Sequence, residues 1–380
     1  MKNFINQKDM RLSNMIDVLT LVRDSGRITR RGIAAVTGMS WGAVSTITAQ
    51  LIEEKYLIEY KDEADRTPEK GAGRTPSYLE INPDEHFAIG LDINSSGLSA
   101  VLTNLKDDVI NRWSAEADFS SKGALLSGIF ELTEKVLSYV GNLGEVGEHH
   151  VCCIGIAMQG IVNAKDGVSV SIRQCADWKE VPLAQMLSDR FDIPVHIEHD
   201  PNCILYASST PNDEDTVLIR IDNGIGMAVI LDGRIINKPG VFEIGHTTVS
   251  QGGDVCSCGR RGCLELYASK RGISNLSGKK FSLLVEDART GDEDALRYFD
   301  SVAKHLAFAI SNVTHLLNIK RVLLCGDMCK CRDLFEEELI SKTKYYSGGD
   351  GLEISFTDVS LAPLGAARIA IERSMKQLSI

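Results

Sequence analysis

The chain has 380 residues, of which 43% are hydrophobic and 24% charged, and these proportions are typical of a globular protein with two or three domains. No run of about 18 apolar residues occurs, and the start lacks an apolar signal-peptide core, so we expect no membrane segment and a cytoplasmic location. The net charge is −11, but residues 1–82 carry 12 Lys and Arg against 11 Asp and Glu, so the acidic excess lies in residues 83–380.

The first 60 residues have the spacing of three short helices. Apolar residues recur at intervals of three and four over 12–25, which predicts one helix. Thr29 is suited to cap a second helix that ends at Gly38, and Ser40 is suited to cap a third helix that reaches about Lys55. Two helices joined by a short turn that contains glycine predict a helix-turn-helix, which binds DNA through its second helix.

Two short strands, over 56–58 and 78–81, predict a hairpin after the last helix. The charged, Gly- and Pro-rich segment 61–76 between them would be the wing, so residues 1–82 are predicted to form a winged helix-turn-helix domain. Candidate DNA contacts are Arg30, Arg31, Ser40, Trp41, Ala43, Ser45 and Thr46 on the helices and Arg74 in the wing. For Trp41 the alternative is packing against the preceding helix, and for Arg74 it is an incidental charge in a solvated linker.

The rest of the chain, from about residue 83 to 380, has the pattern of an α/β protein. Apolar runs predict strands over 87–94, 98–105, 109–113, 151–158, 194–200, 216–222, 226–231, 233–238 and 321–326, and helices over 124–140 and 293–318. We therefore expect two α/β halves, each of them a meander of strands followed by alternating helices and strands.

The segment 243–265 concentrates metal-binding side chains. It contains one imidazole and three thiols, those of His246, Cys256, Cys258 and Cys263, within a glycine-rich stretch. Three sulfur ligands and one nitrogen suit tetrahedral Zn²⁺ in a closed structural site, and the alternative is a loop of clustered free thiols. The chain has ten cysteines in all, and the others are interpreted mainly as buried small hydrophobic residues.

The motif Cys-x-Cys-Gly-x-x-Gly-Cys-x-Glu at 256–265, preceded by Glu-Ile-Gly-His at 243–246, resembles the ROK family of repressors, open reading frames and sugar kinases. The helix-turn-helix and the sequence GAGRTP at 71–76 resemble its repressor branch, which includes xylose-operon and N-acetylglucosamine-operon repressors. The resemblance implies a two-lobed, actin-like (ribonuclease-H-like) fold over residues 83–380, with a sugar cleft between the lobes. It also implies a homodimer or a dimer of dimers.

The same resemblance implies a set of sugar-binding residues. The family positions that line the sugar site correspond here to Gln174, Asp200, Asn202, Glu243, His246 and Glu265. Carboxylates, amides and imidazoles suit a sugar because they accept from or donate to its hydroxyls. His199 replaces a family Asn, and Gln174 stands where the family has a shorter amide. The alternatives are support of the zinc loop for Glu243 and Glu265, and a turn or cap role for Asp200.

Phosphate-binding glycines of the kinase branch are missing in three places. The first loop reads Asp92-Ile93-Asn94-Ser95-Ser96, the second begins with Asp222-Asn223-Gly224, and the third is Cys325-Gly326-Asp327. Asp200, the catalytic base of the kinases, would then be vestigial. We expect a sugar-responsive DNA-binding regulator, a repressor of a carbohydrate-utilisation operon, with operator DNA and a sugar or sugar derivative as partners and no enzymatic activity. The alternatives are an ATP-dependent sugar kinase with a DNA-binding head, and a DNA-bound protein that senses a protein partner.

Overall fold

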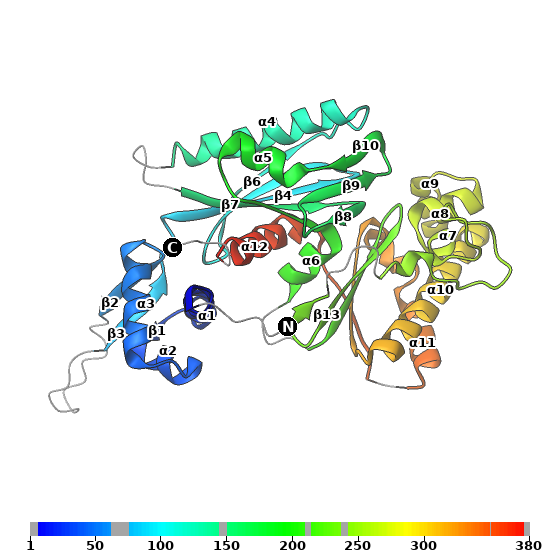
Figure 1. Ribbon diagram of the computed structural model, residues 1–380. Coiled ribbons are helices and arrows are strands. Elements are labelled where there is room, and N and C mark those ends of the chain that lie inside the picture. The colour runs from blue at the N-terminus through cyan, green and yellow to red at the C-terminus, as the bar shows by residue number, and fades with distance from the viewer. Residues whose placement is uncertain are drawn as a thin grey trace. The chain divides into compact units, whose positions relative to one another are not determined.

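The computed structural model describes residues 7–61, 76–143, 150–209, 214–236, 242–349 and 351–375. The chain divides into two compact units (Figure 1): unit 1 consists of Met1–Glu198 with Ala366–Ile380, and unit 2 of His199–Gly365. Within the described ranges, no helix is long and apolar enough to cross a membrane.

The N-terminal part of unit 1, called the head below, is a helix-turn-helix beside a small sheet. Its elements are α1 (Gln7–Ser25), β1 (Ile28–Thr29), α2 (Arg30–Thr37), α3 (Trp41–Glu53), β2 (Leu57–Lys61) and β3 (Ser77–Ile81), and the strands are ordered β1-β3-β2. The predicted caps are confirmed. The Thr29 hydroxyl accepts from the Gly32 amide, the Ser40 hydroxyl accepts from the Ala43 amide, and Gly38 ends α2 in the left-handed region. Strand β1 was not predicted, because two residues carry no periodicity.

The main sheet of unit 1 has the order β11-β7-β4-β5-β6. Its strands are β4 (His86–Asn94), β5 (Gly97–Asn104), β6 (Val109–Ala115), β7 (His150–Met158) and β11 (Val195–His199). Alternate residues of β4 pack on opposite faces of the main sheet. Phe87 and Ile89 pack with α4 (Lys122–Val140) and α5 (Leu183–Phe191), whereas Ala88 packs with α12 (Ala362–Met375) and the head. Figure 1 shows α4 and α5 on one face of this sheet.

A second, three-stranded sheet of unit 1 has no counterpart in the sequence-based prediction. It consists of β8 (Ile161–Asn163), β9 (Val168–Ile172) and β10 (Cys175–Val181), all antiparallel. Trp178 is its buried centre, and its indole N–H donates to the Ser169 hydroxyl at 2.9 Å.

The sheet of unit 2 has the order β14-β13-β12-β15-β16. The main sheet of unit 1 has the same arrangement when its order is read from the other edge, as β6-β5-β4-β7-β11. Its strands are β12 (Thr216–Ile221), β13 (Ile225–Leu231), β14 (Arg234–Ile235), β15 (Arg321–Cys325) and β16 (Glu353–Phe356). In each sheet, an antiparallel meander of three strands is followed by parallel strands on the other side of its first strand. The prediction of two similar α/β halves is therefore confirmed.

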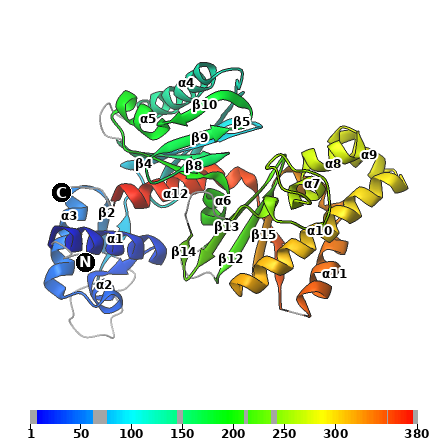
Figure 2. The ribbon, with the colours of Figure 1, turned by 45° about the vertical axis from the view of Figure 1, so that its right-hand side comes forward.

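Helices surround this second sheet. They are α6 (Asp200–Ser208), α7 (Leu264–Ala268), α8 (Lys270–Ser277), α9 (Phe281–Arg289), α10 (Glu293–Leu317) and α11 (Glu336–Ser347), with short 3₁₀ segments η2 (Ile244–His246), η3 (Asp327–Leu334) and η4 (Val359–Leu361). Helices α10 and α11 lie side by side (Figure 2). The predicted strand 194–200 stops at His199, because Asp200 and Pro201 begin α6.

Helix α12 begins in unit 2 and continues into unit 1. Gly365, in its first turn, lies so close to α6 that an added Cβ would be 1.8 Å from the Cys203 carbonyl oxygen. Further along, Ala367, Ala370 and Ile371 belong to the same apolar cluster as the core of the head.

Candidate functional site

Four potential metal ligands of unit 2 converge at η2 and the loop that follows it. The ligand atoms of His246, Cys256, Cys258 and Cys263 all lie within 4.8 Å of one another. The distances are 3.6 Å between Cys256 Sγ and His246 Nδ1, and 3.7 Å between Cys258 Sγ and Cys263 Sγ. A tetrahedral zinc site with Zn–S bonds of about 2.3 Å has S–S edges of about 3.8 Å, so this donor set fits the ion.

Backbone geometry closes this loop. Val255 forms an isolated bridge with Arg261, and Thr248 forms one with Cys263. Gly262 has φ +68°, and an added Cβ would lie 1.8 Å from the Ser250 carbonyl oxygen, so a side chain is excluded there. The amide of Arg260 lowers the pKa of the Cys258 thiol by donating to it. The loop thus holds its ligands near one point through its own backbone.

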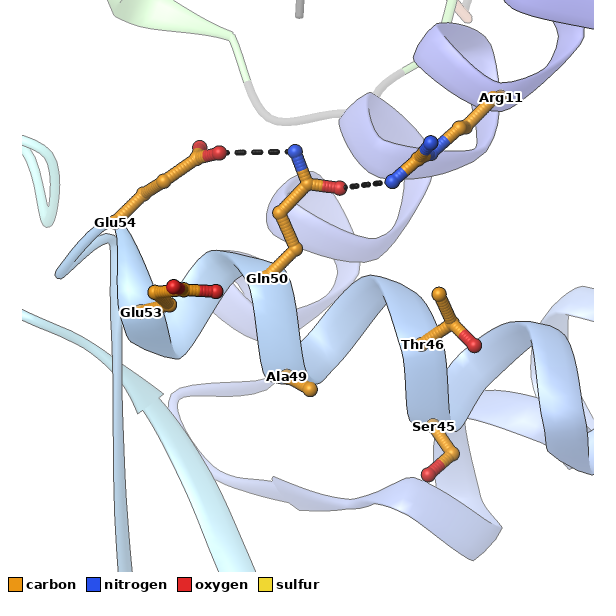
Figure 3. A pocket seen from close by; sticks show the side chains of 7 residues that line it. All are labelled: Arg11, Ser45, Thr46, Ala49, Gln50, Glu53 and Glu54. Atoms are coloured by element: carbon orange, nitrogen blue, oxygen red, sulfur yellow. Dashed lines mark hydrogen bonds between the residues drawn. The ribbon is translucent and has the colours of Figure 1, made fainter.

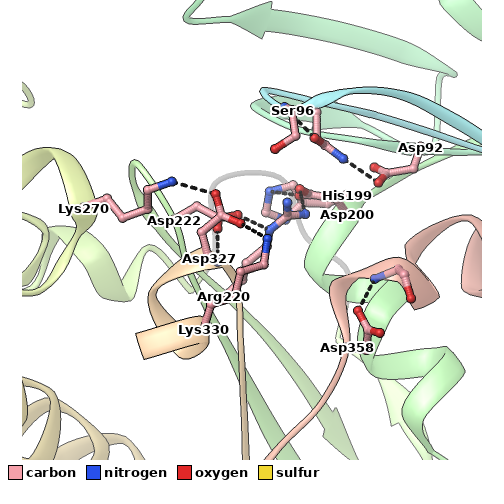
Figure 4. A network of polar contacts seen from close by, with 12 residues as sticks. Asp92, Ser96, His199, Asp200, Arg220, Asp222, Lys270, Asp327, Lys330 and Asp358 are labelled. Atoms are coloured by element: carbon pink, nitrogen blue, oxygen red, sulfur yellow. Dashed lines mark hydrogen bonds and ion pairs between the residues drawn. The ribbon is translucent and has the colours of Figure 1, made fainter. Parts of the chain in front are cut away.

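Asp200 lies at the start of α6 and forms an ion pair with Arg220 of β12 (Figure 4). The same guanidinium donates through Nε to Asp222 at 2.7 Å. His199 Nε2 lies 3.4 Å from the other oxygen of Asp200. The carboxylate that the resemblance predicts to correspond to the base of the kinases is therefore already engaged by a neighbouring cation.

The loops that the resemblance predicts to have lost phosphate-binding glycines are held by side chains of the chain itself. In unit 2, the Asp222 carboxylate accepts from the backbone amide of Asp327 at 2.6 Å, and Lys270 and Lys330 pair with Asp327. In unit 1, the Asn94 side chain accepts from the backbone amide of Ser96 at 2.8 Å. In each unit, one backbone N–H of these loops therefore already has an acceptor.

The remaining residues expected at a sugar site are placed as follows. Asn202 is buried in the first turn of α6. Glu265, in the first turn of α7, is also buried; it accepts from Arg271 at 2.6 Å and from the Ile225 amide at 3.3 Å. Glu243 is exposed directly before η2, which ends at His246. Gln174 belongs to unit 1, where it is exposed between β9 and β10 and accepts from Gln159 at 3.3 Å.

The predicted DNA contacts of the head divide into free and engaged side chains. Arg31 is exposed, whereas Arg30 donates to both carboxylate oxygens of Glu59 on β2 and to the Thr48 hydroxyl. This pairing lowers the pKa of Glu59 to about 2. Arg30 therefore connects α2 to the small sheet, a role that its position in the sequence did not reveal. Arg74 lies outside the described residues.

Trp41 begins α3, and its side chain is 58% exposed, so more than half of it is open to solvent. Along α3, Thr46 is exposed, Ala43 and Ser45 are half-buried, and Ser40 uses its hydroxyl as the cap.

A hollow of about 740 Å³ beside α3 adds residues that sequence reasoning missed. Arg11 reaches from α1 to the side-chain oxygen of Gln50, whose amide nitrogen donates to Glu54 at 2.9 Å (Figure 3). Ala49 and Glu53 line the same hollow. The helical spacing of 45, 46, 49, 50 and 53 is the signal that identifies this face.

Comparisons with known proteins agree on one family. The model of the ROK family matches residues 122–366. The xylose repressor of Caldicellulosiruptor bescii is 26% identical over 352 residues, which cover 86% of each chain. A crystal structure of a ROK family transcriptional regulator, a homologue of the E. coli MLC protein, superposes with a TM-score of 0.82 at 20% identity and covers 97% of each chain.

A kinase of the same family is also similar. The crystal structure of the ROK hexokinase from Thermus thermophilus superposes with a TM-score of 0.66 at 20% identity, and covers 76% of this chain and 98% of its own. It lacks a counterpart to about a quarter of the present chain. Together these structures show that the chain has the two-lobed fold of ROK regulators and kinases.

Proposed function

This chain belongs to the ROK family, and from that membership we propose that it is a sugar-responsive DNA-binding transcriptional regulator that represses a carbohydrate-utilisation operon. The alignment with a xylose repressor over most of both chains supports this proposal. So does the match with a ROK regulator, whose coverage includes the head. In this proposal, residues 1–82 bind operator DNA and residues 83–380 bind the effector.

The effector is a sugar or sugar derivative contacted by Gln174, Asp200, Asn202, Glu243, His246 and Glu265. The carboxylates of Asp200 and Glu265 support this role, because Arg220 and Arg271 hold them in place. A carboxylate held by a guanidinium still has lone pairs that accept from sugar hydroxyls.

We assign Zn²⁺ to His246, Cys256, Cys258 and Cys263 as a structural ion. Because Nδ1 of His246 faces the thiol of Cys256, that nitrogen would bind the metal. Metal binding at Nδ1 leaves Nε2 as an N–H donor of fixed position, which suits a sugar hydroxyl. The ion supplies cross-linking of the loop, and four protein ligands leave it no open position for catalysis.

The occupied backbone amides carry the distinction between a regulator and a kinase. Phosphoryl transfer needs N–H groups that approach the nucleotide phosphates, but the amides of Ser96 and Asp327 already donate to Asn94 and Asp222. The Asp222 carboxylate would also repel a phosphate in its neighbourhood. We therefore propose that the protein binds a sugar without phosphorylating it.

The decisive experiment measures binding and turnover on the same preparation. Operator fragments selected from the genome of origin are titrated with the purified chain, and sugars are then screened for a change in DNA affinity. A ligand changes this affinity only if it binds the two states of the protein differently. We expect at least one monosaccharide to change the operator Kd ten-fold or more, and Glu243→Gln and Asp200→Asn to weaken its effect.

A coupled assay for ADP release tests the kinase alternative with the same sugars. We expect no turnover above background. Turnover near 1 s⁻¹ that Asp200→Asn abolishes would establish a sugar kinase with a DNA-binding head. If no sugar changes operator affinity, and Glu243→Gln leaves regulation intact, the result would instead favour the alternative in which the protein senses a protein partner.

We further propose that the protein acts as a homodimer or a dimer of dimers. A two-fold axis would place two heads on half-sites about one helical turn, or a multiple of it, apart on the DNA. Sedimentation of the free protein and of its operator complex measures the number of chains directly.

A further inference from the structure

Helix α3 lacks the side chains that most often read bases. Between Trp41 and Glu53 it contains no Lys, Arg, His or Asn. The commonest specific contact in the major groove is a bidentate bond from Arg or Lys to guanine, and this helix has neither residue. If it reads DNA, as the proposed function requires, it does so by another kind of contact.

The exposed residues of α3 before Glu53 are small or apolar instead: Trp41, Gly42, Thr46 and Ala49. Trp41 is 58% exposed, and Val36, which lies just before the turn of the helix-turn-helix, is 68% exposed. Thr46 donates its hydroxyl to the Gly42 carbonyl at 3.0 Å, so its methyl group is the substituent left for a partner. One turn further, Ala49 adds another exposed methyl group. Apolar groups exposed together on a recognition element indicate an apolar partner.

Gln50, the one amide on α3, is engaged within the head. Its oxygen accepts from Arg11 and its nitrogen donates to Glu54 (Figure 3). A bidentate contact from Gln to adenine needs the oxygen and nitrogen together, so this arrangement does not favour it. The C5 methyl group of thymine remains as the apolar feature that the major groove offers.

We propose that the head recognises its operator through thymine methyl groups, which contact Trp41, Thr46 and Ala49 on α3 and Val36 on α2. The proposal rests on the proposed DNA-binding function and names the chemistry of its partner. Each half-site then contains A·T pairs at the positions that α3 faces. Arg31 and other cations outside α3 contribute phosphate contacts that position the head without reading sequence.

The main test removes only the C5 methyl groups of thymine from the DNA. The full-length protein selects duplexes from a random-sequence library, and each thymine of the selected site is then replaced by uracil, one at a time. We expect replacement at two or more positions per half-site to weaken binding about four-fold each, the change that burial of one methyl-sized group produces. Trp41→Ala should abolish the sensitivity at one of these positions. Ile161→Ala, which removes an exposed apolar side chain from β8, should leave every position unchanged.

A pair of variants at Thr46 provides a second measurement, in which the protein is changed less than in Trp41→Ala. Thr46→Val retains the methyl group and removes the hydroxyl, whereas Thr46→Ser does the reverse. We expect Thr46→Val to bind like the native protein, and Thr46→Ser to lose about four-fold in affinity and its response to one uracil replacement. Both changes lie at an exposed position, so folding is retained and is checked by melting temperature.

The possible negative results distinguish a failure of the proposed DNA-binding function from a failure of the thymine-methyl proposal. If no sequence is enriched and binding follows salt alone, the proposed function itself is wrong. If a sequence is enriched but all uracil replacements are silent, DNA binding stands and the methyl-reading proposal is overturned. It is also overturned if 7-deazaguanine replacement, and not uracil, costs ten-fold or more. Loss of self-association in Trp41→Ala with unchanged DNA affinity would show that the face binds protein.

Discussion

Arg220 and Asp200 form a buried ion pair within unit 2, with side chains that are only 10% and 7% exposed. Arg220 also donates to Asp222, so one guanidinium lies between two carboxylates and reduces the repulsion between them. Removal of one member of a buried pair leaves an uncompensated charge away from water, and the cost is about 3–5 kcal/mol.

We therefore expect Arg220→Met to lower the free energy of unfolding of unit 2 by about 3 kcal/mol or more. Urea denaturation followed by circular dichroism measures this change. Arg297→Met is the matched control, because Arg297 and Asp294 are 74% and 77% exposed, and an exposed pair contributes less than about 1 kcal/mol. Equal effects of the two variants would contradict the structural role assigned to Arg220.

The cluster of His246, Cys256, Cys258 and Cys263 predicts that each chain binds one metal ion. The native protein should contain one zinc per chain by elemental analysis, and Cys256→Ser should contain none. Loss of the ion removes binding energy that stabilises the fold, so a chelator should lower the melting temperature by roughly 10 °C. Cys329→Ser, which changes a half-buried thiol outside the cluster, should retain the zinc. Zinc-free native protein with an unchanged melting temperature would exclude the assignment.

The neighbours Arg30 and Arg31 should differ in what their loss affects. Arg31 is exposed, so Arg31→Ala should weaken DNA binding and reduce the slope of log K against log salt by about one. Arg30 is held by Glu59 and Thr48, so Arg30→Ala should mainly destabilise the head, by about 1 kcal/mol for this partly exposed pair. Salt titrations and thermal melts of both variants separate the two effects. A full salt-slope change in Arg30→Ala, with native stability, would show that Arg30 leaves Glu59 for a phosphate.

His196 predicts a pH dependence of stability. Burial, together with the charge of Arg373, lowers the pKa of its imidazole from 6.5 to about 4. As pH falls through 6.5 the unfolded chain takes up a proton that the folded chain does not bind until about pH 4. The stability from this group is therefore full above pH 6.5 and decreases over the interval from 6.5 to 4, by about 1–2 kcal/mol at pH 5. Compared with the native protein, His196→Gln should flatten the profile between pH 7 and 5, whereas exchange of the exposed His315 should not.

The sequence predicted the elements whose signals are local. Thr29, Gly38 and Ser40 mark helix ends because a cap is made within three or four residues, and the structure confirms them. Strand β10 escaped prediction for an equally local reason. Its buried residues are Cys175, Trp178 and Val181, spaced by three, because a register shift interrupts the alternation. A spacing of three is not the pattern of a strand.

The candidate sites were predictable to the extent that residue type decides them. The metal ligands lie within 18 residues of one another in a motif, and the structure brings all four together. Arg30 and Glu59 are 29 residues apart in the sequence, and Arg220 and Asp200 are 20 residues apart. No local sequence pattern therefore predicts either pair. Such pairs decide whether a charged side chain faces a ligand or the protein, and this is why Arg30 was assigned to DNA from its position alone.

The position of α12 has a consequence for how the nascent chain folds. Ala367, Ala370 and Ile371 complete the apolar cluster of the head, yet the ribosome makes them after the whole of unit 2, His199–Gly365. At about 5–20 residues per second, unit 1 waits on the order of 10–30 seconds for its final helix. During that interval unit 2 is a continuous segment that can assemble its sheet first, while the surface awaiting α12 stays open to chaperones.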